Sequence, residues 1–493
     1  MTKNFFRSSA LTLFLLGALA VVLTSASNAA PVTGIALTPR VYLPLQFRHY
    51  DAQPPTETRL GAGERPGFLV GASPQSLNLY ATAGLKWART SIFWSLVEPQ
   101  NTSPENYAWD KVDYYLLPMI QSGIEPFVLI LNTPAWAGTT HCGPLYNNAD
   151  FAEFFGAVVA RYPQVKYWGL FNEVDNAVYS LSHGSSGGCF GEPDLDQNGL
   201  ADYADYAELM RVAWKAMHNA NPNTQLVFAI VAFDNFTPAT QPPHYPGGCC
   251  FNHNFLADLL GYMEDHPLPA GDKYADVLGF NNYLAYNLAY WDKHSMGIGV
   301  DAKANALRAI MAAHGFDFPM VITEMSAWPT YPSAEGVPQA TQARQAAQMY
   351  AQALYSDIQF TTWWTWSDYP DTNCGVNVQC DLFKYGLVDS QLTPKQSYFA
   401  VQNLANQLRG WKPDDARIKA KYVDLGFKKN GKKKRVVYAR TNTFIDAVQY
   451  VSFNAHMLRV VDMMGNISTF DDNGTGKISL RVNANPRYVE IDP

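Results

Sequence analysis

Short apolar runs alternate with longer segments of helical periodicity between residues 67 and 408. Eight runs have the length and composition of strands: Gly67–Gly71, Lys86–Ile92, Pro126–Asn132, Tyr167–Phe171, Gln225–Phe233, Val277–Asn281, Pro319–Thr323 and Phe360–Trp366. Between them lie segments such as Tyr203–Ala220, where apolar residues recur at helical spacing. Eight strands that alternate with helices predict an α/β fold whose parallel sheet closes into a (β/α)₈ TIM barrel. A doubly wound open sheet is the alternative, weakened because no glycine-rich phosphate-binding loop follows the first run.

The pattern changes after about Leu408 to short runs separated by turn dipeptides such as Asn430-Gly431 and Asn473-Gly474. The runs are Val436–Ala439, Val448–Phe453, Leu458–Asp462, Ile478–Val482 and Tyr488–Ile491. They predict a small C-terminal antiparallel β-sandwich domain over residues 409–493. The basic run at residues 428–435 is interpreted as a solvated hairpin tip, with polyanion binding as the alternative.

The first 66 residues lack this alternation. Two basic residues precede an apolar run over residues 10–23, and small residues follow it. This is the three-part pattern of a secretory signal peptide, which we assign to residues 1–30, so we expect a secreted protein. An uncleaved N-terminal anchor is the alternative; no other stretch is long and apolar enough to cross a bilayer. Residues 31–66, rich in Pro, Thr and Gly, are predicted to form a linker or extended arm.

Composition narrows the class of partner. The chain has 493 residues, of which 47% are hydrophobic, enough for a large core and a second domain. Its net charge of −7 argues against nucleic acid as the main partner. Aromatic residues make up 14%, which would suit stacking on sugar rings but equally suits a large core. Composition therefore does not identify the function, and the residues at the ends of the predicted strands have to indicate it.

The six cysteines indicate disulfides, because export makes bridges permissible and the number is even. Cys374 and Cys380 could close a short loop. The adjacent Cys249 and Cys250 are expected to pair with Cys142 and Cys189 in some order. Metal binding is the weaker reading, because no CxxC pair is present.

Two strand ends carry the candidate chemistry. The fourth predicted strand runs into Asn172-Glu173, and the seventh runs into Glu324. Functional groups of a (β/α)₈ barrel lie at the C-terminal ends of its strands, so both carboxylates should face the same opening. Cleavage of a glycosidic bond needs such a pair: one acid protonates the leaving oxygen, and one carboxylate attacks the anomeric carbon or activates water. A lone Asn-Glu is a weak signal, since acidic residues often cap helices.

With these endings in place, the sequence resembles clan A glycoside hydrolases, and families 39 and 5 most closely, over roughly residues 67–408. The resemblance implies that Glu173 is the acid/base, that Asn172 before it holds the sugar 2-hydroxyl, and that Glu324 in VITEMSAW is the nucleophile. It implies a retaining mechanism through a glycosyl-enzyme intermediate, with no cofactor for catalysis. Glu173 must then be protonated at rest and serve as base after glycosylation.

The resemblance also implies supporting residues around the two carboxylates. Arg89 in KWARTSIFW and Tyr283 in LGFNNYLAY would both bond the nucleophile, and Asn281 matches an Asn found in some members. An aromatic residue at strand eight should form the floor of the sugar-binding site. Trp364 and Trp366 are the candidates, with Trp366 preferred. Trp136, after strand three, could stack on a neighbouring sugar or simply pack a loop. Outside these roles, each residue could be an ordinary ion-pair partner or core aromatic.

A twelve-residue acidic loop predicts a structural Ca²⁺ site. Oxygen ligands fall at loop positions 1, 3, 5, 9 and 12, with Gly199 at position 6 and a backbone carbonyl at position 7. The expected ligands are Asp194, Asp196, Asn198, Leu200, Asp202 and Asp205. Since position 12 is Asp rather than Glu, the loop resembles the dockerin-type version. The alternative is a solvated acidic loop that caps the following helix.

The sequence therefore predicts a secreted retaining glycoside hydrolase that cleaves β-glycosidic bonds of oligo- or polysaccharides. The alternatives are a non-catalytic carbohydrate-binding barrel, disfavoured because both carboxylates are present, and a Ca²⁺-dependent adhesion protein, which explains neither Glu324 nor Arg89. The sugar, its linkage, exo or endo action and the oligomeric state are not encoded in these patterns.

Overall fold

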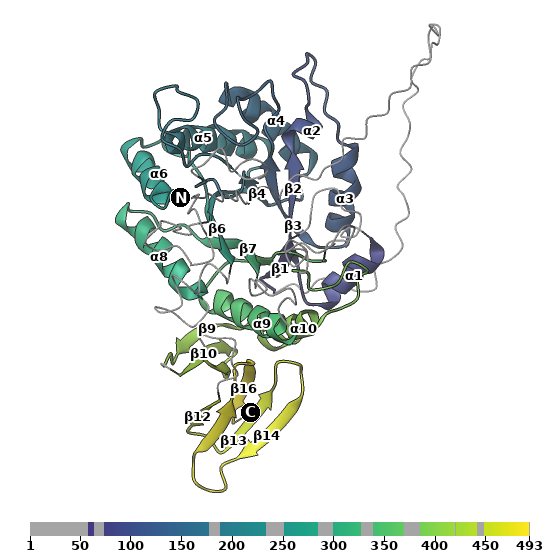
Figure 1. The fold of residues 1–493 in the computed structure, drawn as a ribbon, viewed down its shortest axis with the longest axis vertical. Coiled ribbons are helices and arrows are strands. Elements are labelled where there is room, and N and C mark those ends of the chain that lie inside the picture. Colours follow the sequence, from purple (N-terminus) through teal and green to yellow (C-terminus); the bar gives the residue numbers. More distant parts are fainter. Residues whose placement is uncertain are drawn as a thin grey trace, which may run out of the picture.

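The computed structural model describes residues 58–63, 73–176, 188–232, 251–283, 299–326, 339–368, 385–419, 421–440 and 448–492. They form a barrel surrounded by helices and, below it in Figure 1, a smaller β domain. The assigned signal peptide lies outside the described residues. Among the described helices, none has both the length and the apolar content needed to cross a membrane.

Eight parallel strands close the barrel in sequential order, and β1 pairs with both β2 and β8. The strands are β1 (Leu60–Gly63), β2 (Trp87–Phe93), β3 (Glu125–Leu131), β4 (Tyr167–Leu170), β5 (Gln225–Val231), β6 (Val277–Tyr283), β7 (Met320–Ser326) and β8 (Thr361–Trp363). Their near-continuous apolar sequences are typical of strands buried on both faces by helices. The predicted TIM barrel is confirmed.

Helices follow the strands and cover the outside of the barrel (Figure 1). They are α1 (Pro74–Thr82), α2 (Trp94–Val97), α3 (Asp110–Gln121), α4 (Asn148–Arg161), α5 (Asp202–Ala220), α6 (Phe255–Asp265), α8 (Val300–Ala313), α9 (Gln339–Tyr355) and α10 (Gln396–Leu408). The predicted helix over Tyr203–Ala220 corresponds to α5, which ends at Asn221 before Pro222.

The first strand is not where the sequence pattern put it. β1 lies at Leu60–Gly63, inside the segment predicted to be a linker or arm. The run Gly67–Gly71, predicted as strand one, falls outside the described residues. The sequence of β1, LGAG, has a single large apolar side chain, so no hydrophobic pattern marks it. Gly61 instead allows close approach to β2, because a Cβ there would lie 1.9 Å from the Trp87 carbonyl oxygen.

Two antiparallel sheets make up the C-terminal domain, as predicted. The larger sheet has the order β14-β13-β16-β11-β10-β9, and β12 pairs with β15 to form the smaller one. The strands are β9 (Lys412–Ala416), β10 (Tyr422–Lys429), β11 (Lys432–Ala439), β12 (Gln449–Phe453), β13 (Met457–Val461), β14 (Ile467–Asp471), β15 (Ile478–Val482) and β16 (Arg487–Ile491). Apolar residues from both sheets form one core, including Val437, Val451 and Leu480.

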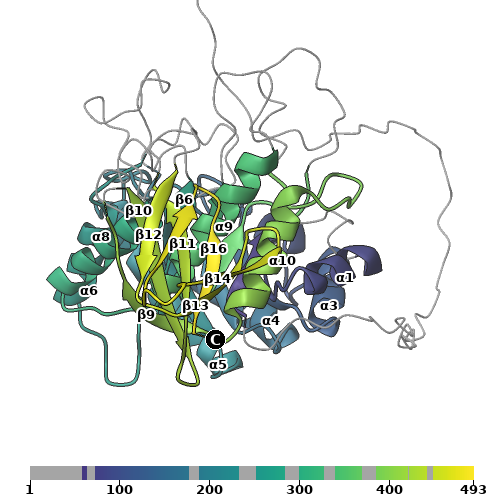
Figure 2. The same ribbon diagram turned by 90° about the horizontal axis from the view of Figure 1, so that it is seen from below.

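The β domain packs against α9 and α10, and Figure 2, seen from that side, shows its strands in front of these helices. Residues Gln342 to Leu354 of α9 are all buried, because the barrel covers one side of the helix and the β domain the other. Polar contacts cross this boundary: Gln348 Nε2 donates to the Ala484 carbonyl at 2.6 Å, and Gln352 Nε2 donates to the Tyr438 hydroxyl at 2.8 Å. The two domains therefore share a buried boundary.

Candidate active site

Glu173 and Glu324 both lie at the C-terminal end of the barrel strands. Glu324 lies within β7, and Glu173 follows β4 by three residues. The backbone after β4 turns sharply: Phe171 has a φ of 59° and Glu173 a φ of 48°, in the left-handed region that non-glycine residues rarely occupy. The Glu173 amide donates to the Ile230 carbonyl at 2.9 Å, which holds this turn against β5. Such local strain is commonly kept at functional sites.

The Glu324 carboxylate is held by two side chains from other strands of the barrel. Arg89 Nη2 on β2 lies 2.6 Å from Glu324 Oε1, and the Tyr283 hydroxyl on β6 donates to Glu324 Oε2. The Arg89 and Glu324 side chains are only 4% and 8% exposed, so the ion pair is shielded from water. Breaking such a buried pair by removing one partner is strongly unfavourable. Glu324 is therefore fixed in orientation with both carboxylate oxygens engaged.

Glu173 is contacted by Asn281, whose Nδ2 donates to Glu173 Oε1 at 3.0 Å. An irregularity in the pairing of β6 with β7 brings Asn281 opposite Glu324. The Thr323 hydroxyl donates to Asn281 Oδ1 at 2.6 Å, and this bond orients the amide so that its NH₂ faces Glu173. We did not predict a role for Thr323. Its complete burial, which requires a partner for the hydroxyl, is visible only in the folded chain.

Asn172 contacts one residue that binds Glu324 and one that binds Glu173. Its Oδ1 accepts from Arg89 Nη2 at 3.0 Å and lies 3.4 Å from Asn281 Nδ2. Arg89 therefore contacts both Glu324 and Asn172, while Asn281 contacts both Asn172 and Glu173. The structure thus brings the two carboxylates together with the four polar residues that the sequence placed around them: Arg89, Asn172, Asn281 and Tyr283.

Burial raises the pKa of Tyr283 well above its ordinary value, and the negative charges of Glu324 and Glu173 raise this pKa further. Tyr283 is therefore a neutral phenol at neutral pH. A neutral phenol keeps its proton to donate to Glu324.

The three predicted tryptophans have different surroundings. Trp364 is half-buried, and the Arg89 guanidinium carbon lies 5.2 Å from its ring centroid, beside the carboxylates. Trp366 is completely buried; its Nε1 donates to Ser76 and its ring packs on Tyr80. The preference for Trp366 as the sugar floor was therefore wrong, because a fully buried ring cannot stack on a ligand. Trp136 is half-buried, with its Nε1 donating to the Glu98 carbonyl.

A disulfide joins two loops at this end of the barrel. Cys142, between β3 and α4, pairs with Cys189, between β4 and α5, across 47 residues of sequence. The expectation that each would pair with Cys249 or Cys250 was therefore wrong. Cys249 and Cys250, like Cys374 and Cys380, lie outside the described residues. The bridge ties Cys189, before α5, to the loop between β3 and α4.

In the acidic loop before α5, several carboxylates accept hydrogen bonds from Asn198. Asn198 Nδ2 donates to Asp196 Oδ2 and to Asp205 Oδ1, each at 3.0 Å, and its backbone N–H donates to Asp194. Burial, with neighbouring carboxylates, raises the pKa of Asp202 to about 7 and that of Asp205 to about 6. The Oδ2 atoms of Asp202 and Asp205 are buried and accept no hydrogen bond from the described chain.

No three His, Cys, Asp or Glu side chains in the described ranges lie close enough together to hold a metal ion. In this loop the Asn198 amide group lies between the carboxylates, and Leu200, expected to offer its carbonyl, is exposed with its N–H donating to Asn198 Oδ1. The Ca²⁺ site remains a prediction.

Two curated proteins match parts of the sequence, while no protein-family model does. An aryl-phospho-β-D-glucosidase of Bacillus subtilis is 30% identical over 113 residues, and a 6-phospho-β-glucosidase of Clostridium longisporum is 28% identical over 180 residues. These matches cover 21% and 34% of this chain, and only 23% and 37% of the length of those relatives.

Solved structures match over far more of the chain. A family 39 glycoside hydrolase of Bacteroides cellulosilyticus has a TM-score of 0.63 at 16% identity, over 88% of this chain and 81% of that one. A β-xylosidase of Caulobacter crescentus has a TM-score of 0.54 at 15% identity, over 90% and 97%. The chain therefore has the fold of these glycoside hydrolases, in agreement with the resemblance seen in its sequence.

Proposed function

We propose that this protein is a secreted retaining glycoside hydrolase, with Glu324 as nucleophile and Glu173 as acid/base. The observation that supports these roles best is the asymmetry between the two carboxylates. Glu324 is bound by a cation and a phenol, which hold both of its oxygens in place for attack. Glu173 is contacted by a neutral amide. Two carboxyl groups in environments this different suit one nucleophile and one proton donor.

The first step of the proposed reaction forms a glycosyl-enzyme. A Glu324 oxygen attacks the anomeric carbon, the bond from that carbon to the leaving oxygen breaks, and Glu173 transfers its proton to this oxygen. The charge of Glu324 is consumed in the new ester, which relieves repulsion on Glu173 as it becomes a carboxylate. Arg89 and Tyr283 hold Glu324 in place beforehand, so little reorganisation is needed during attack.

The second step returns the enzyme to its starting state. Glu173 takes a proton from a water molecule, the water oxygen attacks the anomeric carbon, and the bond to Glu324 breaks. Two inversions at the same carbon give net retention. Asn172 would hold the sugar 2-hydroxyl more tightly as positive charge develops on the ring, and the half-buried Trp364 is the aromatic surface beside the two carboxylates.

The substrate is proposed to be a β-glycoside of an oligo- or polysaccharide. A β-xylosidase and two phospho-β-glucosidases among the similar proteins are all named for their action on β-linked sugars. A set of aryl β-glycosides that includes xylosides, glucosides and galactosides is therefore the appropriate first assay. The described part of the chain offers no feature that selects among these sugars.

The test uses Glu324→Gln, Glu173→Gln and, as a control, Glu264→Gln, which removes a charge from a side chain 57% exposed on α6. Turnover of the best aryl β-glycoside should fall by at least about 10³-fold for the first two variants, since removing a catalytic group typically costs this much. The control should match wild type. Turnover that survives in Glu324→Gln would refute the proposal.

The two roles are separated by azide rescue. Azide should restore activity to Glu324→Gly and yield the α-glycosyl azide, because it attacks opposite the leaving group where the nucleophile is missing. With Glu173→Ala, azide attacks the glycosyl-enzyme and should yield the β-product. The reverse pattern of products would exchange the two assignments.

A structural Ca²⁺ ion in the acidic loop is a further part of the proposal. Asp202 is fully buried, and its unbonded Oδ2 lies in a loop where Asp194, Asp196 and Asp205 are also close to Asn198. A buried carboxylate oxygen with no partner is costly, and a cation would offset that cost. The ion would brace the loop that follows Glu173 and take no part in the chemistry.

A further inference from the structure

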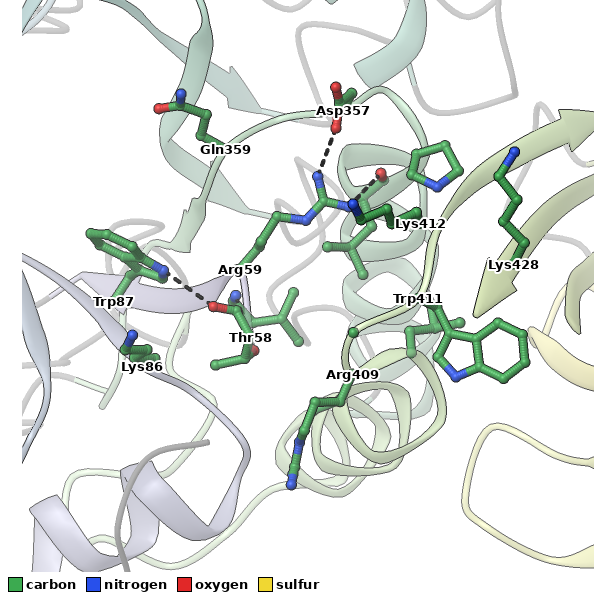
Figure 3. Close-up of a pocket in the computed structure, with 16 residues that line it drawn as sticks. Thr58, Arg59, Lys86, Trp87, Asp357, Gln359, Arg409, Trp411, Lys412 and Lys428 are labelled. Carbon is green, nitrogen blue, oxygen red and sulfur yellow. Dashed lines mark hydrogen bonds and ion pairs between the residues drawn. The ribbon is translucent and has the colours of Figure 1, made fainter. Parts of the chain in front are cut away.

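A second pocket lies at the end of the barrel opposite the two carboxylates. It has a volume of about 780 Å³, large enough for a small oligosaccharide segment. Its walls come from the N-terminal ends of β1, β2 and β8 and from residues 409–413, which lead from α10 into the C-terminal domain. In Figure 3, Arg59 extends across its middle, with Trp87 on one side and Trp411 on the other.

The lining of this pocket is strongly cationic in a chain of net charge −7. It contains five cations, Arg59, Lys86, Arg409, Lys412 and Lys428, and one carboxylate, Asp357. Three of the cations have acidic partners: Arg59 pairs with Asp357, Lys86 with Glu125 and Lys428 with Asp414. Arg409 and Lys412 are exposed, and no described carboxylate lies within ion-pair distance of either.

A row of lysines continues from the pocket across the C-terminal sheet. Lys412 on β9 is directly opposite Lys428 on β10, which in turn is opposite Lys433 on β11. Directly opposed residues project from the same face of a sheet, and like charges there are destabilising. Asp414 relieves part of this repulsion, at 3.0 Å from Lys428 and 3.8 Å from Lys433. Unfavourable charge of this kind is offset when an anionic ligand binds along it.

Two indole rings add a surface on which sugars can stack. Trp87 and Trp411 both line the pocket and are half-buried, so part of each ring is accessible. Each is held in place by its neighbours: Trp87 stacks on Phe360 at a centroid distance of 4.4 Å, and Lys434 Nζ lies 4.7 Å from the Trp411 ring centroid. Rigid aromatic rings with a polar edge suit sugar rings, which have an apolar face and polar hydroxyl groups at their edge.

We propose that this pocket and the lysine row formed by Lys412, Lys428 and Lys433 bind an acidic polysaccharide, one that carries carboxylate groups, at a site separate from the catalytic one. The sugar rings would lie against Trp87 and Trp411, and the carboxylates would approach Arg409 and the lysine row. The choice of a carbohydrate among possible anions rests on the proposed function. Such a site would hold the enzyme on its polymer while the opposite end of the barrel acts.

The experiment measures binding by calorimetry, which needs no turnover and so is independent of whether the proposed activity is found. The probes are polygalacturonate oligomers and neutral galactan oligomers of equal length, at low salt. We expect binding of the acidic oligomer alone, and weakening as salt is raised toward about 0.5 M, where exposed charges are screened. Equal binding of the neutral oligomer, or equally strong binding of inorganic phosphate or single-stranded DNA, would overturn the proposal.

The decisive variant is the double substitution Arg409→Gln with Lys412→Gln. Both side chains are exposed, so the fold should be retained, as circular dichroism would verify. Affinity for the acidic oligomer should fall about tenfold, as expected from loss of two charge contacts. The control, Lys111→Gln with Lys477→Gln, makes the same charge change at exposed positions outside the pocket lining and should bind like wild type. An equal loss in both double variants would show general electrostatics rather than a site.

Discussion

At the scale of single residues, the candidate site depends on the hydrogen bonds that orient its amide and hydroxyl groups. Asn281 can donate to Glu173 because Thr323 occupies the other end of its amide group. The sequence indicated Asn281 through family resemblance, but it did not indicate Thr323, because a threonine within a strand is ordinary. What gives Thr323 significance is complete burial, which is visible only in the folded chain.

Thr323→Val tests this positioning role while keeping the shape of the side chain. Without the hydroxyl, Asn281 Oδ1 loses the bond that helps to keep its NH₂ group facing Glu173 and Asn172, so we expect kcat/KM on an aryl β-glycoside to fall about tenfold. The pH–rate profile should also shift on the limb that reports Glu173, which a purely structural defect would leave in place. Thr323→Ser, which keeps the hydroxyl, should restore both. A loss without any change in the profile would argue against positioning.

Glu98 provides a test of pH-dependent stability near the same end of the barrel. Burial, with the nearby carboxylates of Glu105 and Glu153, raises the pKa of Glu98 to about 7. The unfolded chain releases this proton near pH 4.5, so between about pH 4.5 and 7 the native state binds more protons and stability falls as pH rises. Glu98→Gln keeps an acceptor for Trp94 and removes this slope.

Urea unfolding of wild type and Glu98→Gln at pH 5 and pH 8 measures the effect. The variant should gain on the order of 2 kcal/mol relative to wild type between the two pH values. Asp317→Asn, which removes a carboxylate at an exposed position between α8 and β7, serves as the control and should follow wild type. A difference between wild type and Glu98→Gln that is independent of pH would contradict the raised pKa.

At the scale of elements, the sequence predicted strands well where apolar runs were long and poorly where backbone alone defines them. β2 to β7 each contain an apolar core that the predicted runs include, whereas β1 is four residues with one large apolar side chain. The same limit applies to the segment after β8. Alternation of Trp and Thr there cannot reveal that Trp364 is half-buried while Trp366 packs against α1. Disulfide pairing likewise depends on which loops meet, and Cys142 and Cys189 meet because adjacent strands β3 and β4 carry their loops.

The acidic loop before α5 is the element whose stability should respond to Ca²⁺. After treatment with chelator, added Ca²⁺ should raise the melting temperature, because an ion bound only by the native state stabilises it by mass action, by about 2.7 kcal/mol at one hundred times the dissociation constant. Asp202→Asn should reduce this shift. Asp272→Asn removes a carboxylate that, among the described residues, forms an ion pair with Lys215 alone, and it should leave the shift intact. If added Ca²⁺ leaves the melting temperature of wild type unchanged, the site is excluded.

At the scale of the whole molecule, one helix belongs to two domains. The β domain was predicted from sequence as a separate unit, yet the structure buries α9 between it and the barrel, with glutamines rather than apolar residues at several of the contacts. A buried glutamine of this kind can be recognised only by its partners in the folded chain. The second pocket lies along the same boundary, so a ligand there would contact both domains.

Sharing of α9 predicts that the two domains unfold together, so calorimetry should show a single transition. Gln348→Ala removes the donor to the Ala484 carbonyl, leaves that buried acceptor without this partner, and should cost about 1–3 kcal/mol. If the domains are coupled through α9, the single transition moves to lower temperature as a whole. Gln402→Ala, on α10 with a bond to Thr82 in an exposed setting, is the matched control and should change little. Two separate transitions, with only one of them lowered by Gln348→Ala, would mean that the β domain stabilises the barrel less than its buried boundary indicates.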